Sequence, residues 1–245
     1  MRVLVVDDLL MAETEVARAL EADRDVEVVG VRNPTELAAL LDRDGDFQLA
    51  LVDLHYGKET RESGLAAFDV LSTHGIASVV HSVDEDNRML FLLAVFRFFP
   101  ETWTIVPKSA GRGPLRRAVE AAQAGHRADD TAARPYKRAA PLLDQLIRRP
   151  TDLIIWRAML NHFREPQVAR SANVSKRVVS QFTADRRPVV AHIESELLHR
   201  RNPPAAAPDE RNTNLLEVSA FARLNADFFT DPTVDRLITG TAGPR

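Results

Sequence analysis

Acidic, hydroxyl and basic side chains follow short apolar runs in the first half of the chain. Asp7 and Asp8 follow VLVV, Asp53 follows LALV, Ser82 follows SVVH and Lys108 follows TIVP. Carboxylates gathered in one place need a cation or a proton, and Mg²⁺ prefers such oxygen ligands. The three acids therefore predict a magnesium site. In that site Asp53 is the candidate nucleophile toward phosphorus, Lys108 offsets the charge of the acyl phosphate, and Ser82 contacts a phosphate oxygen.

These side chains meet only if the apolar runs are parallel strands of one sheet. Five short runs rich in Val, Ile or Leu occupy residues 2–6, 26–31, 47–52, 77–82 and 103–107, and segments of helical character alternate with them. One helix is expected to begin at Pro34 with Asn33 as its N-cap, and the last to end at Gly125. The alternation predicts a parallel sheet with helices on both faces, whose reactive groups collect at the carboxyl edge.

The four motifs VLVVDD, LALVDL, VVHS and IVPK, in this order, resemble the receiver domain of bacterial two-component response regulators. DVEVVGVRNPTEL also resembles the NarL/LuxR type of that family. The resemblance covers about residues 1–125 and implies an α/β, (βα)5 flavodoxin-like fold. It implies Mg²⁺ as the cofactor and a sensor histidine kinase as the phosphoryl donor. The implied roles are phospho-acceptor for Asp53, metal ligation for Asp7, Asp8, Asp53 and the backbone carbonyl of His55, and phosphate or switch contacts for Ser82 and Lys108.

Three positions depart from the family pattern. Val83 stands where a small residue is usual, Ile105 where an aromatic ring often switches, and Pro107 precedes Lys108 rather than following it. We therefore expect the phosphorylation chemistry to be retained and its readout to differ. A flavodoxin-like domain with coincidental acids is the alternative.

Charge divides the chain into unlike parts. Lys and Arg number 14 against 23 Asp and Glu in residues 1–133, 14 against 6 in residues 134–201, and 4 against 6 in residues 202–245. The net charges are therefore −9, +8 and −2. A basic part favours nucleic acid as its partner, although a basic solvated surface is the alternative. With the breaks HRADDTAARPYKRAAP and RNPPAAAPDERN, the expected parts are a receiver domain at 1–125, a linker at 126–141, a DNA-binding domain at 142–202 and a C-terminal helical extension at 203–245.

The basic part contains the spacing of a helix-turn-helix. In EPQVARSANVSKRVVSQFTADRR the apolar residues fit two helices joined by a tight turn. Asn173 suits the turn because asparagine tolerates a left-handed backbone, and Ser175 is the expected N-cap of the second helix. An all-α helix-turn-helix domain, loosely resembling NarL/LuxR output domains, is predicted. Its expected DNA contacts are Ser175, Lys176, Arg177, Ser180, Gln181, Arg186 and Arg187, with Arg170 near the DNA backbone.

Two further segments leave alternatives open. MLFLLAVFRFF at 89–99 is apolar almost all round, which indicates either burial within the chain or a self-association face. PVVAHIESELLHRR and TNLLEVSAFARLNADFF are amphipathic, and they either complete the core of the basic part or form a dimer helix.

The combined prediction is a DNA-binding transcriptional regulator, dimeric and cytoplasmic, rather than an enzyme. The alternative is a receiver-adaptor whose helical part binds a protein. The chain has no cysteine, which excludes disulfides and thiolate sites, and its longest apolar run is too short to span a bilayer. Phosphatases that use an aspartyl phosphate need two acids two residues apart after one strand, and the adjacent Asp7 and Asp8 do not fit that spacing.

Overall fold

A computed structural model describes residues 1–9, 11–20, 25–56, 63–83, 88–197 and 210–240. The chain forms two compact units. The first contains residues 1–85 and 94–137, and the second contains residues 86–93 and 138–245. The expected boundary between residues 202 and 203 lies outside the described residues.

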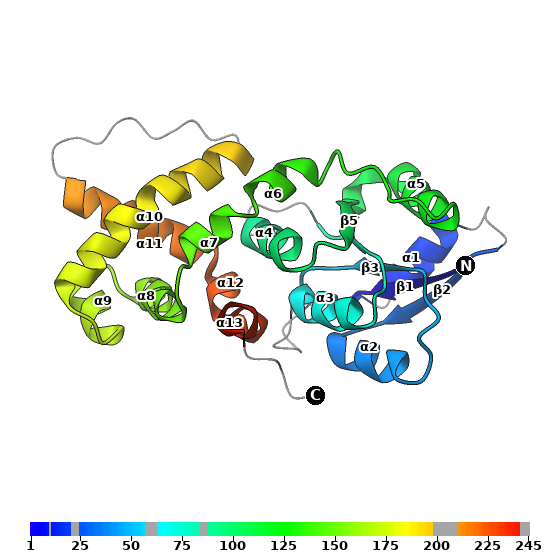
Figure 1. Ribbon diagram of the computed structural model, residues 1–245, viewed down its shortest axis with the longest axis horizontal. Coiled ribbons are helices and arrows are strands. Elements are labelled where there is room, and N and C mark those ends of the chain that lie inside the picture. The colour runs from blue at the N-terminus through cyan, green and yellow to red at the C-terminus, as the bar shows by residue number, and fades with distance from the viewer. Residues whose placement is uncertain (10, 21–24, 57–62, 84–87, 198–209, 241–245) are drawn as a thin grey trace. The chain divides into compact units, whose positions relative to one another are not determined.

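The first unit is built on a five-stranded parallel sheet with the order β2-β1-β3-β4-β5 (Figure 1). Val3, Leu4, Val5 and Val6 of β1 are all nearly inaccessible to solvent, as expected for a central strand covered on both faces. The five strands lie within one or two residues of the predicted runs. They are β1 (Arg2–Val6), β2 (Glu27–Val31), β3 (Leu49–Val52), β4 (Ser78–Val80) and β5 (Thr102–Ile105).

Helices cover both faces of this sheet. Val16 of α1 and Leu115 and Val119 of α5 pack with the side chains of Val3 and Leu51 on one face. Helices α2 and α3 contact each other on the opposite side (Figure 1). The helices of the unit are α1 (Ala12–Ala19), α2 (Pro34–Leu41), α3 (Gly64–Thr73) and α5 (Arg112–Gln123). Helix α6 (Arg134–Ala139), inside the predicted linker, contains the boundary between the two units. This arrangement confirms the predicted flavodoxin-like fold.

Local sequence signals fix where the helices begin and end. The Asn33 side chain accepts a hydrogen bond from the backbone N–H of Glu36 at 2.8 Å, which confirms the predicted cap ahead of Pro34. Gly125 has a φ of 70° after the end of α5, as predicted. Gly64 begins α3 directly behind the acidic site, where an added Cβ atom would clash with the backbone carbonyl oxygen of Asp53. The glycine therefore lets this loop approach β3 closely.

The second unit is entirely helical, and its core surrounds Trp156. The indole ring stacks on Phe229 with centroids 4.7 Å apart and meets the rings of Phe182 and Phe221 at 5.2 and 6.0 Å. Its Nε1–H donates to the backbone carbonyl of Leu146 at 3.2 Å. The helices are α7 (Leu142–Leu146), α8 (Pro150–Asn161), α9 (Glu165–Ser171), α10 (Lys176–Leu197), α11 (Glu210–Leu224), α12 (Ala226–Thr230) and α13 (Pro232–Thr239).

The three C-terminal helices complete this core. Phe221 of α11 and Phe228 and Phe229 of α12 are at most 2% exposed, and α11 packs along both α8 and α10. Asp231 caps α13 by accepting hydrogen bonds from the backbone N–H groups of Thr233 and Val234. Of the two alternatives left open by the sequence, core completion is the one that the structure supports.

The apolar segment at 89–99 forms α4 (Met89–Phe98). Every side chain from Met89 to Phe96 is at most 8% exposed. Residues 89–93 group with the helical unit, where Phe91 meets the Phe228 ring edge to face at 5.4 Å. This contact within the helical unit favours burial within the chain for the first half of the helix.

None of the described helices has the length and apolarity needed to cross a membrane.

Candidate functional site: an acidic pocket and a helix-turn-helix

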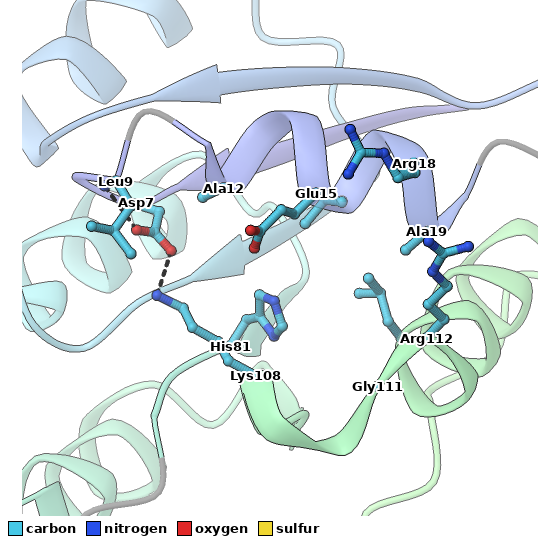
Figure 2. Close-up of a pocket in the computed structure, with 12 residues that line it drawn as sticks. Asp7, Leu9, Ala12, Glu15, Arg18, Ala19, His81, Lys108, Gly111 and Arg112 are labelled. Carbon is cyan, nitrogen blue, oxygen red and sulfur yellow. Dashed lines mark hydrogen bonds and ion pairs between the residues drawn. The ribbon is translucent and has the colours of Figure 1, made fainter.

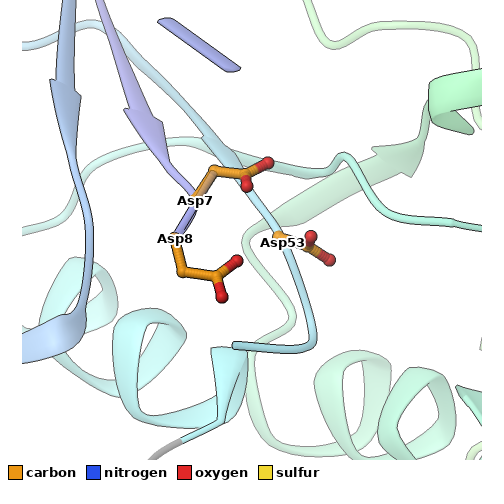
Figure 3. A group of neighbouring side chains, drawn as sticks. All are labelled: Asp7, Asp8 and Asp53. Carbon is orange, nitrogen blue, oxygen red and sulfur yellow. The ribbon is translucent and has the colours of Figure 1, made fainter. Parts of the chain in front are cut away.

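Three carboxylates lie together at the carboxyl edge of the sheet. Asp7 and Asp8 come directly after β1, and Asp53 comes directly after the neighbouring strand β3 (Figure 3). One carboxylate oxygen from each lies within 4.8 Å of those of the other two. Asp7 and Asp53 are buried, whereas Asp8 is half-buried. The parallel register of β1 and β3 thus joins side chains that are 45 residues apart in the sequence.

Ser82 and Lys108 complete the pocket from β4 and β5. The Ser82 hydroxyl donates to Asp53 Oδ1 at 2.5 Å. The Lys108 ammonium group lies 2.5 Å from Asp53 Oδ2 and 2.6 Å from Asp7 Oδ2. The backbone N–H of His55 adds a donor to Asp53 Oδ1 at 3.3 Å. All five predicted side chains are therefore brought together, and both oxygens of Asp53 are engaged.

Burial and charge act in opposite directions on the ionisable groups of this pocket. Burial raises the pKa of Asp7 above its ordinary value, despite the opposing effect of the Lys108 ammonium group. Burial alone would lower the pKa of Lys108, but the nearby carboxylates of Asp53 and Asp7 outweigh it and raise that pKa. The charged form of Lys108 is thus favoured, whereas burial disfavours the ionised form of Asp7.

The donor set of the pocket fits a divalent cation. Three carboxylates lie together, and the Lys108 ammonium group pairs with two of them, those of Asp7 and Asp53. Oxygen-only ligands suit a hard cation such as Mg²⁺. The raised pKa of Asp7 indicates a carboxylate that a cation would help to ionise.

Replacing Asp7 by asparagine is expected to stabilise the metal-free protein at pH 7. A raised pKa means that the folded state binds a proton on Asp7 at pH values where the unfolded chain has released it, so ionised Asp7 opposes folding above that range. The melting temperature of Asp7→Asn should exceed that of the wild type. This difference should shrink as the pH falls through the raised pKa of Asp7 toward its ordinary value of 3.8.

The exposed Asp46→Asn variant is the matched control, because it removes an acid at the far end of β3. Added Mg²⁺ should stabilise the wild type more than Asp7→Asn, because ligation needs the carboxylate. A lower melting temperature for Asp7→Asn at pH 7 would contradict the prediction.

A cavity of about 230 Å³ lies beside the acidic pocket, between α1 and the start of α5 (Figure 2). Asp7, His81 and Lys108 line one end, and Glu15 and Arg112 also line it. His81 Nδ1 lies 2.8 Å from the Val106 carbonyl oxygen. Burial lowers the pKa of His81, so its neutral form is favoured.

The second unit contains the predicted helix-turn-helix, formed by α9 and α10. Asn173 has a φ of 53° in the turn, which is the left-handed conformation expected there. The Ser175 hydroxyl caps α10 by accepting a hydrogen bond from the backbone N–H of Val178 at 3.3 Å. Helix α10 continues for 22 residues with Pro188 in its interior. Both local predictions for this motif are confirmed.

Most of the predicted DNA-contacting side chains share one polar groove. The groove has a volume of about 660 Å³ and is lined by Lys176, Arg177, Ser180 and Gln181 of α10. Lys176 and Arg177 are exposed and form no ion pair with the described residues. These cations are therefore available for an anionic partner.

The two arginines farther along α10 are engaged within the protein. Arg187 is half-buried and binds Glu217 through two nitrogens, at 2.5 and 3.3 Å, and Asn214 at 3.1 Å. Arg186 is only 3% exposed. Its guanidinium group binds the carboxylate of Asp152 at 2.6 Å and the backbone carbonyl of Leu146 at 2.9 Å.

The expectation that Arg186 contacts DNA is therefore wrong. Its side chain points into the core of the helical unit, where it compensates the fully buried carboxylate of Asp152. This pairing could not be predicted from the sequence, because the two residues are 34 positions apart and carry no characteristic motif.

Asp185, on the same helix, contacts one of the predicted DNA-contacting residues. Its carboxylate accepts a hydrogen bond from the Gln181 side-chain amide at 2.7 Å. The spacing of four residues on one helix is the signal that would have identified the pair.

Comparisons with known proteins support the fold of both units. A DNA complex of the two-component response regulator RcsB has 18% identity and a TM-score of 0.58, with 89% of this chain and 98% of that chain covered. RcsB of Salmonella enterica serovar Typhimurium, bound to the promoter P1flhDC with the phosphomimetic BeF3⁻, has 18% identity, the same coverages and a TM-score of 0.57. A structure of two RcsB dimers bound to two parallel DNAs has 20% identity, again the same coverages and a TM-score of 0.53. No protein-family model and no curated protein sequence matches the chain.

Proposed function

We propose that this chain is a two-component response regulator that controls transcription. Asp53 of the first unit would accept a phosphoryl group from a sensor histidine kinase. The second unit would bind specific DNA as part of a homodimer. The acidic pocket carries this proposal, because Ser82 and Lys108 both bind Asp53 beside two further carboxylates. The RcsB structures that share the fold include complexes with DNA, dimers and a phosphoryl mimic.

The pocket residues have separable roles in phosphoryl transfer. Asp53 supplies the carboxylate oxygen that attacks phosphorus while the bond between phosphorus and the donor breaks, and Lys108 stabilises the negative charge on the transferred group. Ser82, which now donates to Asp53, would donate to a phosphate oxygen instead. Bound Mg²⁺, held by Asp7, Asp8, Asp53 and the backbone carbonyl of His55, would screen the repulsion between the carboxylate and the phosphoryl oxygens.

The helical unit has the parts needed to read DNA. The exposed half of α10 presents Lys176, Arg177 and Gln181 in one groove, as a recognition helix does in the major groove. Arg170 on α9 is also exposed. Arg187 can contact DNA only through guanidinium N–H groups that do not already bind Glu217 or Asn214.

The salt dependence of binding to duplex DNA tests the output function. If Lys176, Arg177 and Arg170 each contact one phosphate, the logarithm of affinity should fall against that of salt concentration with a slope of about −3 per protomer. The Lys176→Ala variant should make this slope shallower by about 1. Arg134→Ala, an exposed arginine in the other unit, is the control and should leave it unchanged. Binding that does not depend on salt would exclude the DNA-binding function.

A receiver-adaptor is the second candidate function. Phe163 and Leu216 of the helical unit are 60% and 57% exposed, which suits contact with a protein. Such a partner would be held with little salt dependence, and the same titration therefore separates the two functions.

A further inference from the structure

The amide of Gln181 is fixed by a neighbour that can only accept hydrogen bonds. Its Nε2 atom donates to Asp185 Oδ1 at 2.7 Å, one helical turn farther along α10. The Asp185 carboxylate also lies 3.8 Å from the Arg148 guanidinium group. An ionised carboxylate has no proton to donate, so the Gln181 amide cannot turn its carbonyl oxygen toward Asp185. The orientation of this amide is therefore determined by charge.

This orientation leaves a defined pattern on the exposed side of Gln181. One amide N–H is used by Asp185, so the carbonyl oxygen and a single N–H remain without a partner among the described residues. Adenine presents an acceptor, N7, beside a donor, the N6 amino group, in the major groove. The remaining N–H and carbonyl oxygen of Gln181 therefore match the N7 acceptor and N6 donor of adenine.

Guanine presents two adjacent acceptors, O6 and N7. A glutamine could satisfy both only by directing both amide N–H groups at the base, and Asp185 occupies one of them. The Gln181 carbonyl oxygen would also face guanine O6, and two acceptors repel each other. The same contact thus favours adenine and disfavours guanine.

We propose that Asp185, held by Arg148, is a positioning residue that makes Gln181 selective for adenine over guanine. This inference rests on the proposed DNA-binding function and extends it to the base that one side chain reads. Arg148 also reduces the repulsion that an acid on a recognition helix would exert on DNA phosphates.

Selection from a pool of randomised duplexes, using the full chain, tests the proposal. The wild type should show one position where adenine is preferred over guanine by about tenfold. Gln181→Ala should lose the preference at that position only. Asp185→Ala should bring adenine and guanine close to parity there, because the released amide can direct both N–H groups at guanine. Asp185→Asn keeps the shape but can donate as well as accept, and it should relax the same position.

A merely structural role for Asp185 predicts other results. It would lower the melting temperature or weaken binding to every sequence equally, and the adenine preference would survive in Asp185→Ala. That outcome overturns the inference, as does a wild-type preference that Gln181→Ala leaves intact. If the wild type binds no duplex at all, the proposed DNA-binding function fails. If it binds duplexes but Asp185→Ala keeps the adenine preference, only the inference about Asp185 fails.

Discussion

Replacing Asp53 by asparagine is expected to abolish phosphorylation of the protein. Incubation of the wild type with Mg²⁺ and acetyl phosphate should add the mass of one phosphoryl group, located at Asp53. The asparagine amide is not a nucleophile and does not attract the Lys108 ammonium group as a carboxylate does. The initial rate should fall at least about a thousandfold, as for other removed nucleophiles. Intact-protein mass spectrometry measures the change.

Controls separate the nucleophile from the metal ligands. Asp46→Asn, an exposed acid at the far end of β3, should be phosphorylated like the wild type. Replacing Asp7 and Asp8 together by alanine should abolish metal-dependent phosphorylation while the circular dichroism spectrum stays unchanged. Mg²⁺-dependent phosphorylation of that double variant would show that these acids are not the ligands. A wild type without any mass gain would make the first unit a receiver that works without phosphorylation.

Replacing Arg186 by alanine is expected to destabilise the helical unit by about 3–5 kcal/mol. The change removes the 2.6 Å ion pair of the buried Asp152 carboxylate, which keeps only the exposed Arg149 guanidinium group at 3.8 Å and the backbone N–H of Arg148 at 2.9 Å. It also removes one of the two donors to the Leu146 carbonyl, the other being Trp156. Such a loss is a large part of the stability of an ordinary domain. Urea unfolding followed by tryptophan fluorescence measures it, because Trp156 lies in the affected core.

Arg177→Ala is the matched control on the same helix. Arg177 is exposed, so its removal should change stability by no more than about 0.5 kcal/mol while weakening DNA binding. Arg186→Met combined with Asp152→Leu should recover stability, because an apolar pair can replace a buried ion pair. Unchanged unfolding of Arg186→Ala together with lost DNA binding would instead restore Arg186 as a DNA contact.

The sheet and its site were predictable because both depend on local signals. A strand buried on both faces is a continuous apolar run, and in a parallel sheet each such run ends at the same edge. The positions of Asp7 and Asp53 therefore followed from the sequence alone. The cap of α2 at Asn33 and the turn at Asn173 were predictable for a similar reason, since each depends on a few neighbouring residues.

The helical unit was less predictable because its core depends on distant partners. Arg186 stands in a basic segment of the sequence, and only the fold brings Asp152 to it. The amphipathic pattern of α11 does not say whether its apolar face meets α8 and α10 or a second copy. In α4, apolar residues on all sides left burial and self-association open, and only the fold brings Phe228 to Phe91.

Pro188 interrupts the backbone hydrogen bonding of α10, and the positions around it differ in how freely they can be substituted. A proline has no N–H group, so the carbonyl of Ala184 lacks its usual helical donor. Beyond Pro188, Val189, Val190 and Ile193 are buried. Before it, Arg177 and Gln181 are exposed, although other side chains of the same stretch, such as Phe182, are buried. Substitutions at the exposed positions can therefore alter the surface that we propose reads DNA at little cost to folding. The buried positions on either side of Pro188 do not have that freedom.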